Sequence, residues 1–341
     1  MKAPSPAPET DKLPGVFYAV WEDGLELPVL DVTHPAFRVN SESEELEAQA
    51  RDWTQKQNRA GFLGRVFNRY VLPQVLSRST IGRGLIAANG THLDALTTYL
   101  LKLGPKALGN YSDLDRRISG SIAGTLLRVR VQDLASAQAR ALSPLLADDG
   151  TRPLHLLNVA GGPANDSLNT LLLLNRDNPD LLLRRKSTIH LLDLDANGSR
   201  FAANALAAWQ TDGAPLHGVQ VELKTSSFDW SQAASLDTVF ESIARDAVVL
   251  VTSEGGLFDY GADADILTTL SAIHQWAPND AQICGTLSTP SDAGQAIRRG
   301  SVASVITRTV DDFTGLVAKA RWVLAEYWTR PTSSGFRLTK A

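Results

Sequence analysis

The stretch LHLLNVAGGPANDS, Leu154–Ser167, decides the fold, because it has the pattern of a buried strand, a tight turn and the start of a helix. The strand, 154–159, is largely apolar, as expected where helices cover a parallel sheet on both faces. Gly161 and Gly162 then allow a sharp turn with few side-chain atoms in the way, and Pro163 suits a turn or a first helical turn. We therefore expect a junction that can hold a ligand, with an ordinary strand-turn-helix connection as the alternative.

The polar residues after this turn suit a helix start. Asn165, Asp166 and Ser167 can each accept a hydrogen bond from the free N–H groups of the first helical turn. Backbone donors that remain free at such a junction point toward whatever binds above the edge of the sheet. The turn and the helix start together predict a ligand-binding edge.

The composition describes a globular protein and excludes several other classes. The chain has 341 residues, of which 43% are hydrophobic and 21% are charged, so a large core is possible and general disorder is excluded. Its formal net charge of -4 provides no overall basic field, and we expect no nucleic-acid partner. The length accommodates two modest domains, or one large domain with an extension.

The single cysteine and the N-terminal sequence bear on the cellular compartment. Cys284 has no second cysteine with which to form a disulfide or a thiolate metal cluster, and we expect it to be a small core residue. The N-terminus MKAPSPAPETDKLPG lacks the apolar run of a signal peptide, and no segment reaches the roughly 18 apolar residues of a membrane span. We therefore expect a cytoplasmic protein with no membrane span.

Residues 1–150 are expected to form a mainly helical domain that begins with a hairpin. Two β-rich runs flank the turn Glu22–Gly24, which is typical of a hairpin. Apolar residues at helical spacing predict the helices, which cover 41–57, 58–76, 91–104 and one long run, 113–146.

Residues 151–341 change to strands that alternate with helices, which is the pattern of a parallel sheet covered on both faces. We expect strands at 154–159, 188–192, 220–224, 247–252 and 282–287, and helices near 166–176, 197–209, 235–243, 263–276 and 311–320. Two final strands, 321–329 and 334–340, are joined by a turn. The predicted fold class is α/β, with a doubly wound, mostly parallel seven-stranded sheet that ends in an antiparallel hairpin and follows the helical domain.

From Leu154 to the end, this order of motifs resembles the class I S-adenosylmethionine-dependent methyltransferases. NVAGGPAND resembles the glycine-rich loop of that family, with Asn158 in the place of the acidic residue. Ala160, Gly162 and Ala164 stand in the three glycine places. Asn158 can accept a hydrogen bond from the amino group of the cofactor but brings no charge, and alanine at a glycine place tolerates less backbone strain.

The resemblance also assigns the next two strand ends to the ribose and the adenine of S-adenosylmethionine. It implies that Asp193 holds the ribose, because a carboxylate supplies two acceptors to a diol. If the strand ends two residues later, Asp195 would hold the ribose instead; otherwise Asp195 suits a helix N-cap. Ser227, Phe228 and Asp229 would border the adenine or accept from its amino group, although a core phenylalanine and a capping aspartate are equally simple interpretations.

The fourth strand ends in VTSEGGLFDYG, 251–261, and a Gly-Leu-Phe-Asp-Tyr run in this place resembles a bacterial small-molecule branch of the family. Glu254 is the nearest candidate for a general base, with a structural role as the alternative. Ahead of the sheet, Tyr111 and Arg117 are candidates to cover the methionine end of the cofactor. The expected cofactor site comprises Tyr111, Arg117, Asn158, Ala160, Gly161, Gly162, Asp166, Asp193, Leu194, Ser227, Phe228, Asp229 and Ser253.

No metal site is expected, because the six histidines are scattered and suit surface or capping positions for the most part. The resemblance implies methyl transfer to a small-molecule acceptor by in-line displacement, with the acceptor selected by the N-terminal domain. The apolar faces of the N-terminal helices must be buried against the core, an apolar acceptor or a second subunit, so a homodimer is possible. Arg298 and Arg299 either meet an anionic acceptor or are solvated helix charges, and we favour the second interpretation.

Two other functions fit parts of the sequence. A nicotinamide-dependent dehydrogenase also has a glycine-rich first turn, but its Gly-x-Gly-x-x-Gly spacing is absent, and 193 - 162 = 31 residues separate Gly162 from Asp193 instead of about 20. Another use of S-adenosylmethionine, or a catalytically silent binding module, would keep the same motifs. The nucleophile elbow of a hydrolase and the phosphate-binding loop of a nucleotide triphosphatase are missing from the sequence.

Overall fold

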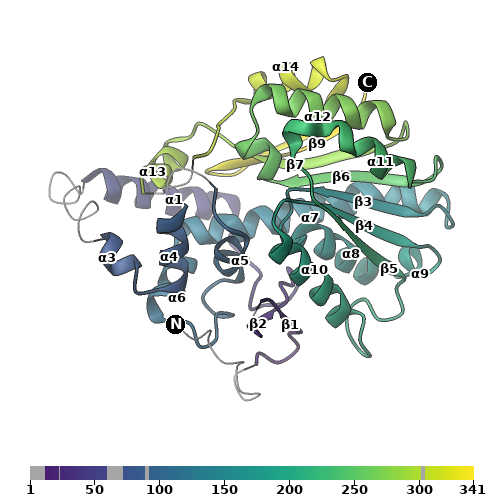
Figure 1. Cartoon of the computed structure of the whole chain (residues 1–341). Coiled ribbons are helices and arrows are strands. Elements are labelled where there is room, and N and C mark those ends of the chain that lie inside the picture. The colour runs from purple at the N-terminus through teal and green to yellow at the C-terminus, as the bar shows by residue number, and fades with distance from the viewer. Residues whose placement is uncertain (1–11, 23, 60–71, 89–91, 301–303) are drawn as a thin grey trace.

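A computed structural model describes residues 12–22, 24–59, 72–88, 92–300 and 304–341 (Figure 1). The chain begins with an antiparallel hairpin of two short strands, as predicted. Helices then gather beside the sheet (Figure 1). The elements of this part are β1 (Tyr18–Val20), β2 (Glu26–Pro28), α1 (Ser43–Arg59), α3 (Leu72–Leu76), α4 (Thr80–Ala87), α5 (Ala95–Leu103), α6 (Asp113–Ser119) and α7 (Ile122–Asp148).

Strands and helices alternate in the rest of the chain. The strands are β3 (Leu154–Val159), β4 (Ser187–Leu192), β5 (Val221–Ser226), β6 (Val248–Glu254), β7 (Gln282–Ser288), β8 (Trp322–Thr329) and β9 (Ser333–Lys340). The helical elements are α8 (Asn165–Asp177), α9 (Asp180–Leu183), α10 (Ala196–Trp209), η3 (Trp230–Ser235), α11 (Leu236–Glu241), η4 (Gly256–Tyr260), α12 (Asp263–Trp276), α13 (Asp292–Gly300) and α14 (Val310–Lys319).

The seven-stranded sheet confirms the predicted fold class. Its strand order is β5-β4-β3-β6-β7-β9-β8, and the first five strands in that order are parallel. β9 lies antiparallel to both β7 and β8, which gives the terminal hairpin. The chain builds outward in one direction from β3 and in the other from β6, so a topological switch point lies between them. In open α/β sheets, ligands bind at the carboxyl ends of the strands beside such a point.

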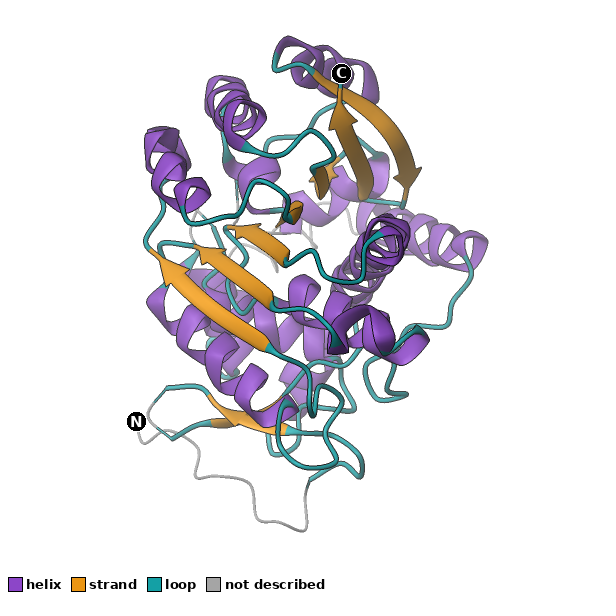
Figure 2. Ribbon diagram, turned by 90° about the vertical axis from the view of Figure 1, so that its right-hand side faces the viewer, coloured by secondary structure: helices purple, strands orange, loops and turns teal. Residues whose placement is uncertain are grey.

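Helices cover both faces of the sheet (Figure 2). A separate apolar core lies on each face. One core joins α5, α7, α8 and α10 to Leu154 and Leu156 of β3 and also includes Leu27 of the N-terminal hairpin. The other core joins α11, α12 and α14 to Leu157 and Val159 of the same strand. Alternate residues of β3 therefore serve different cores, which explains why the whole strand is buried. Cys284 is buried in the first core, as predicted, and burial raises the pKa of its thiol to about 12.

Several elements differ from the prediction in extent. The run 113–146 forms two helices, because the Ser121 side chain accepts a hydrogen bond from the Gly124 N–H and caps a new helix. Most of the predicted helix 58–76 lies outside the described residues. The short helices α4 and α9 were not expected from the apolar periodicity. None of the described helices combines the length and apolar character that a membrane crossing requires.

Two of the six histidines are buried together, whereas the other four are exposed or half-buried. His155 of β3 and His190 of β4 are 8% and 4% exposed, and the Nδ1 atom of His155 lies 2.9 Å from the Nε2 atom of His190. Their rings stack with centroids 5.2 Å apart. Burial lowers the pKa of each ring to about 4, so both are neutral at pH 7.

We expect this pair to make the fold sensitive to mild acid. Between about pH 6.5 and pH 4, the unfolded chain binds protons that the folded rings exclude, so the free energy of unfolding falls as the pH falls. Urea denaturation at pH 7 and pH 5 should show that His190→Gln removes about 2 kcal/mol of this pH dependence. His217→Gln, at an exposed position, is the control and should leave it unchanged. Equal pH dependence in both variants would contradict the prediction.

Candidate functional site

The glycine-rich turn between β3 and α8 has a strained backbone. Ala160, Gly162 and Ala164 have φ angles of 53°, 52° and 53°, in the left-handed region. Such a conformation costs a non-glycine residue about 1–2 kcal/mol, so the surrounding structure must hold the two alanines in place. Ala164 is the N-cap of α8 and provides no side-chain cap. The prediction that Asn165, Asp166 and Ser167 cap the helix is therefore wrong, and all three side chains are buried instead.

A buried hydrogen-bond network lies directly beneath this turn. The Asn158 Nδ2 group donates to Asp166 Oδ1 over 2.7 Å and to Ser167 Oγ over 2.8 Å. The other carboxylate oxygen, Asp166 Oδ2, accepts from Thr252 Oγ1 at 2.6 Å and from Gln138 Nε2 at 3.1 Å. Asn158 is fully buried, and Asp166 is 1% exposed. The network thus connects the end of β3 to α8, to β6 and to the long helix α7.

Asp193 lies at the end of β4 and turns its carboxylate toward the same turn. Its Oδ2 atom accepts from the Gly162 N–H over 2.7 Å, and its Oδ1 atom accepts from the Asp195 N–H over 2.8 Å. Burial raises the pKa of this carboxyl group. Each oxygen retains a further lone pair for a ligand donor. Asp195 caps α10 by accepting from the N–H groups of Asn197 and Gly198, which confirms its N-cap interpretation.

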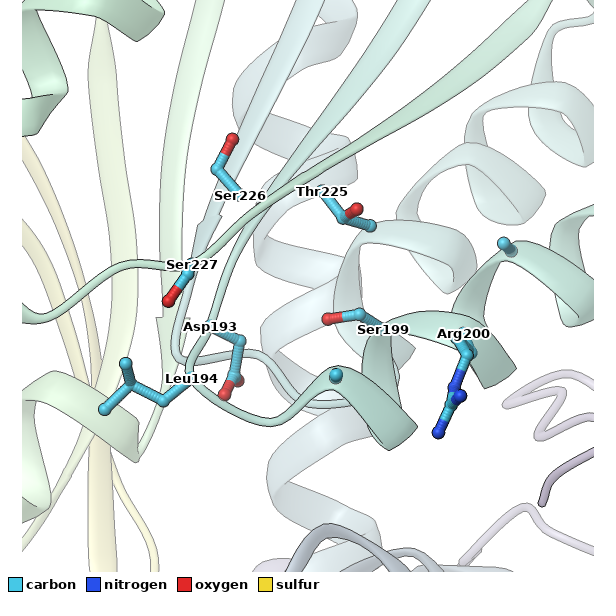
Figure 3. A pocket seen from close by; sticks show the side chains of 9 residues that line it. Asp193, Leu194, Ser199, Arg200, Thr225, Ser226 and Ser227 are labelled. Carbon is cyan, nitrogen blue, oxygen red and sulfur yellow. The ribbon is translucent and has the colours of Figure 1, made fainter.

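A pocket of about 270 Å³ opens beside Asp193, between α10 and the end of β5. Figure 3 shows Leu194 and Ser227 pointing to one side of it, whereas Ser199 and Arg200 extend from α10. Leu194 is 67% exposed although it is a large apolar residue, so it offers a surface for a flat apolar ligand. The pocket is lined by Asp193, Leu194, Ala196, Ser199, Arg200, Ala203, Thr225, Ser226 and Ser227.

Gly198 lets the first turn of α10 approach the glycine-rich turn closely. A Cβ atom at residue 198 would lie 2.9 Å from the carbonyl carbon of Gly162 and 3.1 Å from its Cα. These neighbours are backbone atoms, so the turn itself would have to move. We expect Gly198→Ala to separate Gly162 from Asp193 and to weaken binding at this edge about tenfold, measured by calorimetry with the ligand proposed below. Gly315→Ala, within the helix α14 and with nothing within 4 Å of the added Cβ, is the control for loss of a helical glycine.

The three residues predicted to border the adenine lie in different surroundings. Phe228 is 4% exposed and packs in the core that contains α11 and α12. Asp229 accepts from the N–H and Oγ groups of Ser231 over 2.9 and 2.7 Å, and these hydrogen bonds lower its pKa. Ser227 is exposed at the pocket. The exposed Ser227 and the half-buried Asp229 therefore remain accessible to a ligand, whereas the Phe228 side chain does not.

Four buried charges meet where β6 ends. Lys102 of α5 donates to Glu254, and the Arg130 Nε atom of α7 lies 3.5 Å from the other oxygen of the same carboxylate. Arg130 also donates to Asp259 over 2.8 Å and to Thr286 over 2.6 Å. All four charged side chains are 6–8% exposed. Glu254 thus links α5 and α7 to the end of β6. Its role as a general base remains a prediction.

The glycines after Glu254 allow contacts within the protein. Gly255 has a φ angle of 84°, and a Cβ there would lie 2.2 Å from the Arg130 Nη2 atom. A Cβ at Gly256 would lie 2.5 Å from the Ala160 Cβ atom. The Ser253 hydroxyl accepts from the Leu257 N–H over 3.1 Å and begins the π-helical turn η4. This tight turn therefore packs the end of β6 against both the ion cluster and the glycine-rich turn.

The remaining candidates lie in the helical part of the chain. Tyr111 packs against the first core, and burial together with the charge of Asp115 raises the pKa of its hydroxyl to about 12. That hydroxyl has no hydrogen-bond partner among the described residues. Arg117 is exposed on α6. The side chains of Arg298 and Arg299 lie outside the described part of the structure.

Sequence reasoning missed the partners that come from the helices before β3. In the sequence, Lys102 and Arg130 look like ordinary solvent-exposed charges on predicted helices, and no motif marks Gln138. They meet partners more than a hundred residues further along the chain, so no local spacing identifies them. Among the described residues, no group of three or more histidine, cysteine, aspartate or glutamate side chains gathers as metal ligands would.

Comparison with known proteins identifies a shared fold. No family model matches the sequence, and no curated protein matches it. A possible exported protein from Bordetella parapertussis is 18% identical in sequence. The structural match covers 88% of this chain and 97% of that one, with a TM-score of 0.56.

Two methyltransferase structures are more distant. Mitomycin 7-O-methyltransferase MmcR is 13% identical in sequence. The structural match covers 67% of this chain and 59% of that one, with a TM-score of 0.42. The N,N-8-amino-8-demethyl-D-riboflavin dimethyltransferase RosA from Streptomyces davawensis is 14% identical; the match covers 67% of this chain and 60% of that one at a TM-score of 0.41.

Proposed function

We propose that the chain binds S-adenosylmethionine and transfers its methyl group to a small-molecule acceptor. One observation carries the proposal: the Asp193 carboxylate at the end of β4 is hydrogen-bonded to Gly162 in the turn after β3, beside an open pocket. Two adjacent strand ends thus present a carboxylate and a small-residue turn at one edge of the sheet. The sheet order, with its switch point between β3 and β6, places that edge where ligands bind in open α/β folds.

The residues present at this edge fit the proposed cofactor. Asp193 would accept hydrogen bonds from the two ribose hydroxyls through the lone pairs that the backbone leaves free. Leu194 and Ser227 would border the adenine, since they face the pocket. Asn158 has a buried carbonyl oxygen, Oδ1, with no partner among the described residues, and it would face the methionine end. When bound, S-adenosylmethionine supplies a methyl group on a positively charged sulfur, which an acceptor displaces in line.

The contribution of the chain would be to orient the two reactants and to exclude water. In-line displacement needs the acceptor atom, the methyl carbon and the sulfur in one line, and positioning alone supplies much of the rate in such reactions. The helix α5 lies close to the glycine-rich turn, because a Cβ at Gly162 would be 3.9 Å from the Ala95 Cβ atom. The N-terminal helices would therefore cover the reacting groups and select the acceptor.

Calorimetry on the full-length protein tests this proposal. We expect S-adenosylmethionine and S-adenosylhomocysteine to bind in the low micromolar range or tighter, and NAD to show no binding. Incubation with radiolabelled methyl donor and small-molecule extracts of the host should then yield a labelled product. Binding of NAD without binding of S-adenosylhomocysteine would reject the proposal in favour of a dehydrogenase. Binding of the cofactor with no labelled product would favour a silent binding module.

A further inference from the structure

We propose that Asp166 supplies the negative charge by which the glycine-rich turn recognises the ammonium group of its ligand, and that it acts through Asn158. Asp166 is thus a positioning residue in the layer beneath the turn, and Asn158 is the residue that contacts the ligand. This inference rests on the proposed function, because the ammonium group is that of S-adenosylmethionine.

The orientation of the Asn158 amide is the first step of the argument. An ionised carboxylate can only accept hydrogen bonds, so the group that Asn158 turns toward Asp166 must be its NH2 group. The structure shows this arrangement, with Nδ2 lying 2.7 Å from Asp166 Oδ1 and 2.8 Å from Ser167 Oγ. The carbonyl oxygen is consequently directed to the opposite side. Asp166 therefore determines which end of the amide faces the glycine-rich turn.

The position of that carbonyl oxygen is the second step. Asn158 Oδ1 lies against Gly161, at the place that a side chain would occupy, because a Cβ at residue 161 would be 1.7 Å away. Glycine is thus required there to make room for the amide. Asn158 is fully buried, and its Oδ1 atom accepts no hydrogen bond from the described residues. A buried acceptor without a partner costs about 1–3 kcal/mol, which favours a ligand that donates to it.

The charge beneath the turn is the third step. Asp166 is 1% exposed, and the three side chains that donate to its carboxylate, from Asn158, Thr252 and Gln138, are all uncharged. None of the ion pairs among the described residues includes it. A buried charge without an opposite charge is unfavourable, and a positive ligand group nearby would stabilise it. The amide dipole of Asn158, with its NH2 group toward Asp166, points its negative end at the turn.

The chemistry of the cofactor identifies the group that is recognised. S-adenosylmethionine carries two positive groups, a sulfonium and an ammonium, and only the ammonium has N–H donors. The Asn158 Oδ1 atom would therefore accept from the ammonium group. An aspartate at residue 158 would place two carboxylates within hydrogen-bond distance, which accounts for the uncharged residue in this place.

Calorimetry with three ligands and four variants tests the inference on the full-length protein. Asp166→Asn should weaken binding of S-adenosylmethionine and S-adenosylhomocysteine about tenfold or more, since both carry the ammonium group. Binding of 5′-methylthioadenosine, which lacks that group, should change less than about twofold. Thr252→Val removes one hydrogen bond to Asp166 but keeps the charge, so it should weaken S-adenosylmethionine binding by less than about threefold.

A charge exchange provides the sharpest comparison. Asn158→Asp alone should weaken S-adenosylmethionine binding and lower the melting temperature, because it places two carboxylates together. Adding Asp166→Asn should restore binding to within about threefold of the wild type, because one negative charge and one amide are again paired. Melting temperatures measured alongside show which variants are folded.

The outcomes separate this inference from the function on which it rests. Asp166→Asn protein that binds S-adenosylmethionine as tightly as the wild type would overturn the inference alone. Equal losses for S-adenosylmethionine and 5′-methylthioadenosine would also overturn it, since they would indicate general damage to the site. Wild-type protein that binds neither S-adenosylmethionine nor S-adenosylhomocysteine would overturn the proposed function itself.

Discussion

Replacing Arg130 with methionine is expected to lower the free energy of unfolding by about 3–5 kcal/mol, because it leaves the buried Asp259 carboxylate without its cation. Arg130 is 8% exposed and donates to Asp259 over 2.8 Å, and it lies 3.5 Å from Glu254. Lys102 still pairs with Glu254 in this variant, so Asp259 bears most of the loss. Urea denaturation at pH 7 measures the effect.

A second ion pair on the same helix serves as the control. Arg140 of α7 pairs with Glu326 over 3.1 Å, and the arginine side chain is 61% exposed. Exposed pairs contribute little, so Arg140→Met should cost less than about 1 kcal/mol. Adding Asp259→Asn to Arg130→Met should recover part of the stability, because the uncompensated charge is removed. If Arg130→Met and Arg140→Met cost the same, the ion cluster does not hold α7 to the sheet.

The second large effect is expected at Asp193. Asp193→Ala should weaken the binding of S-adenosylmethionine by about 2 kcal/mol, or roughly thirtyfold, because two charge-assisted hydrogen bonds to the ribose are lost. The substitution also removes the acceptor of the Gly162 N–H, so the glycine-rich turn loses one of its contacts. Calorimetry at pH 7 gives the affinity, and thermal unfolding shows whether the variant is folded.

Asp195→Ala is the matched control two residues away. It removes the N-cap of α10 and should cost about 1 kcal/mol of stability while changing the affinity by less than about threefold. The two substitutions therefore separate binding from helix capping. A greater loss of affinity in Asp195→Ala than in Asp193→Ala, with both proteins folded, would reassign the ribose to Asp195.

The sequence determined the sheet because each strand carries its own signal. The apolar run of 154–159 predicts a strand covered on both faces, and the structure buries every residue of β3. The small residues that follow predict a sharp turn, which the positive φ angle of Gly162 confirms. The terminal hairpin and the N-cap role of Asp195 were equally evident. All of these features depend on residues within a few positions of one another.

Only the tertiary structure decided the polar and charged interior. The amide of Asn158 and the carboxylate of Asp166 are eight residues apart, yet the bonds that orient them also come from α7 and β6. The pairing of His155 with His190 depends on the register of two neighbouring strands. Arg130 reaches the Asp259 carboxylate across 129 residues of chain.

The physical reason is the range of the interactions. Apolar periodicity and turn chemistry act along the chain, so they can be read from neighbouring residues. A buried charge needs an opposite charge or hydrogen-bond donors, and packing brings these from any part of the sequence. For this protein, the sequence alone therefore determined the sheet and the edge at which the glycine-rich turn lies. Which polar side chains meet beneath that edge, and how they are oriented, was decided by the packing of α5, α7 and α8 against the strands.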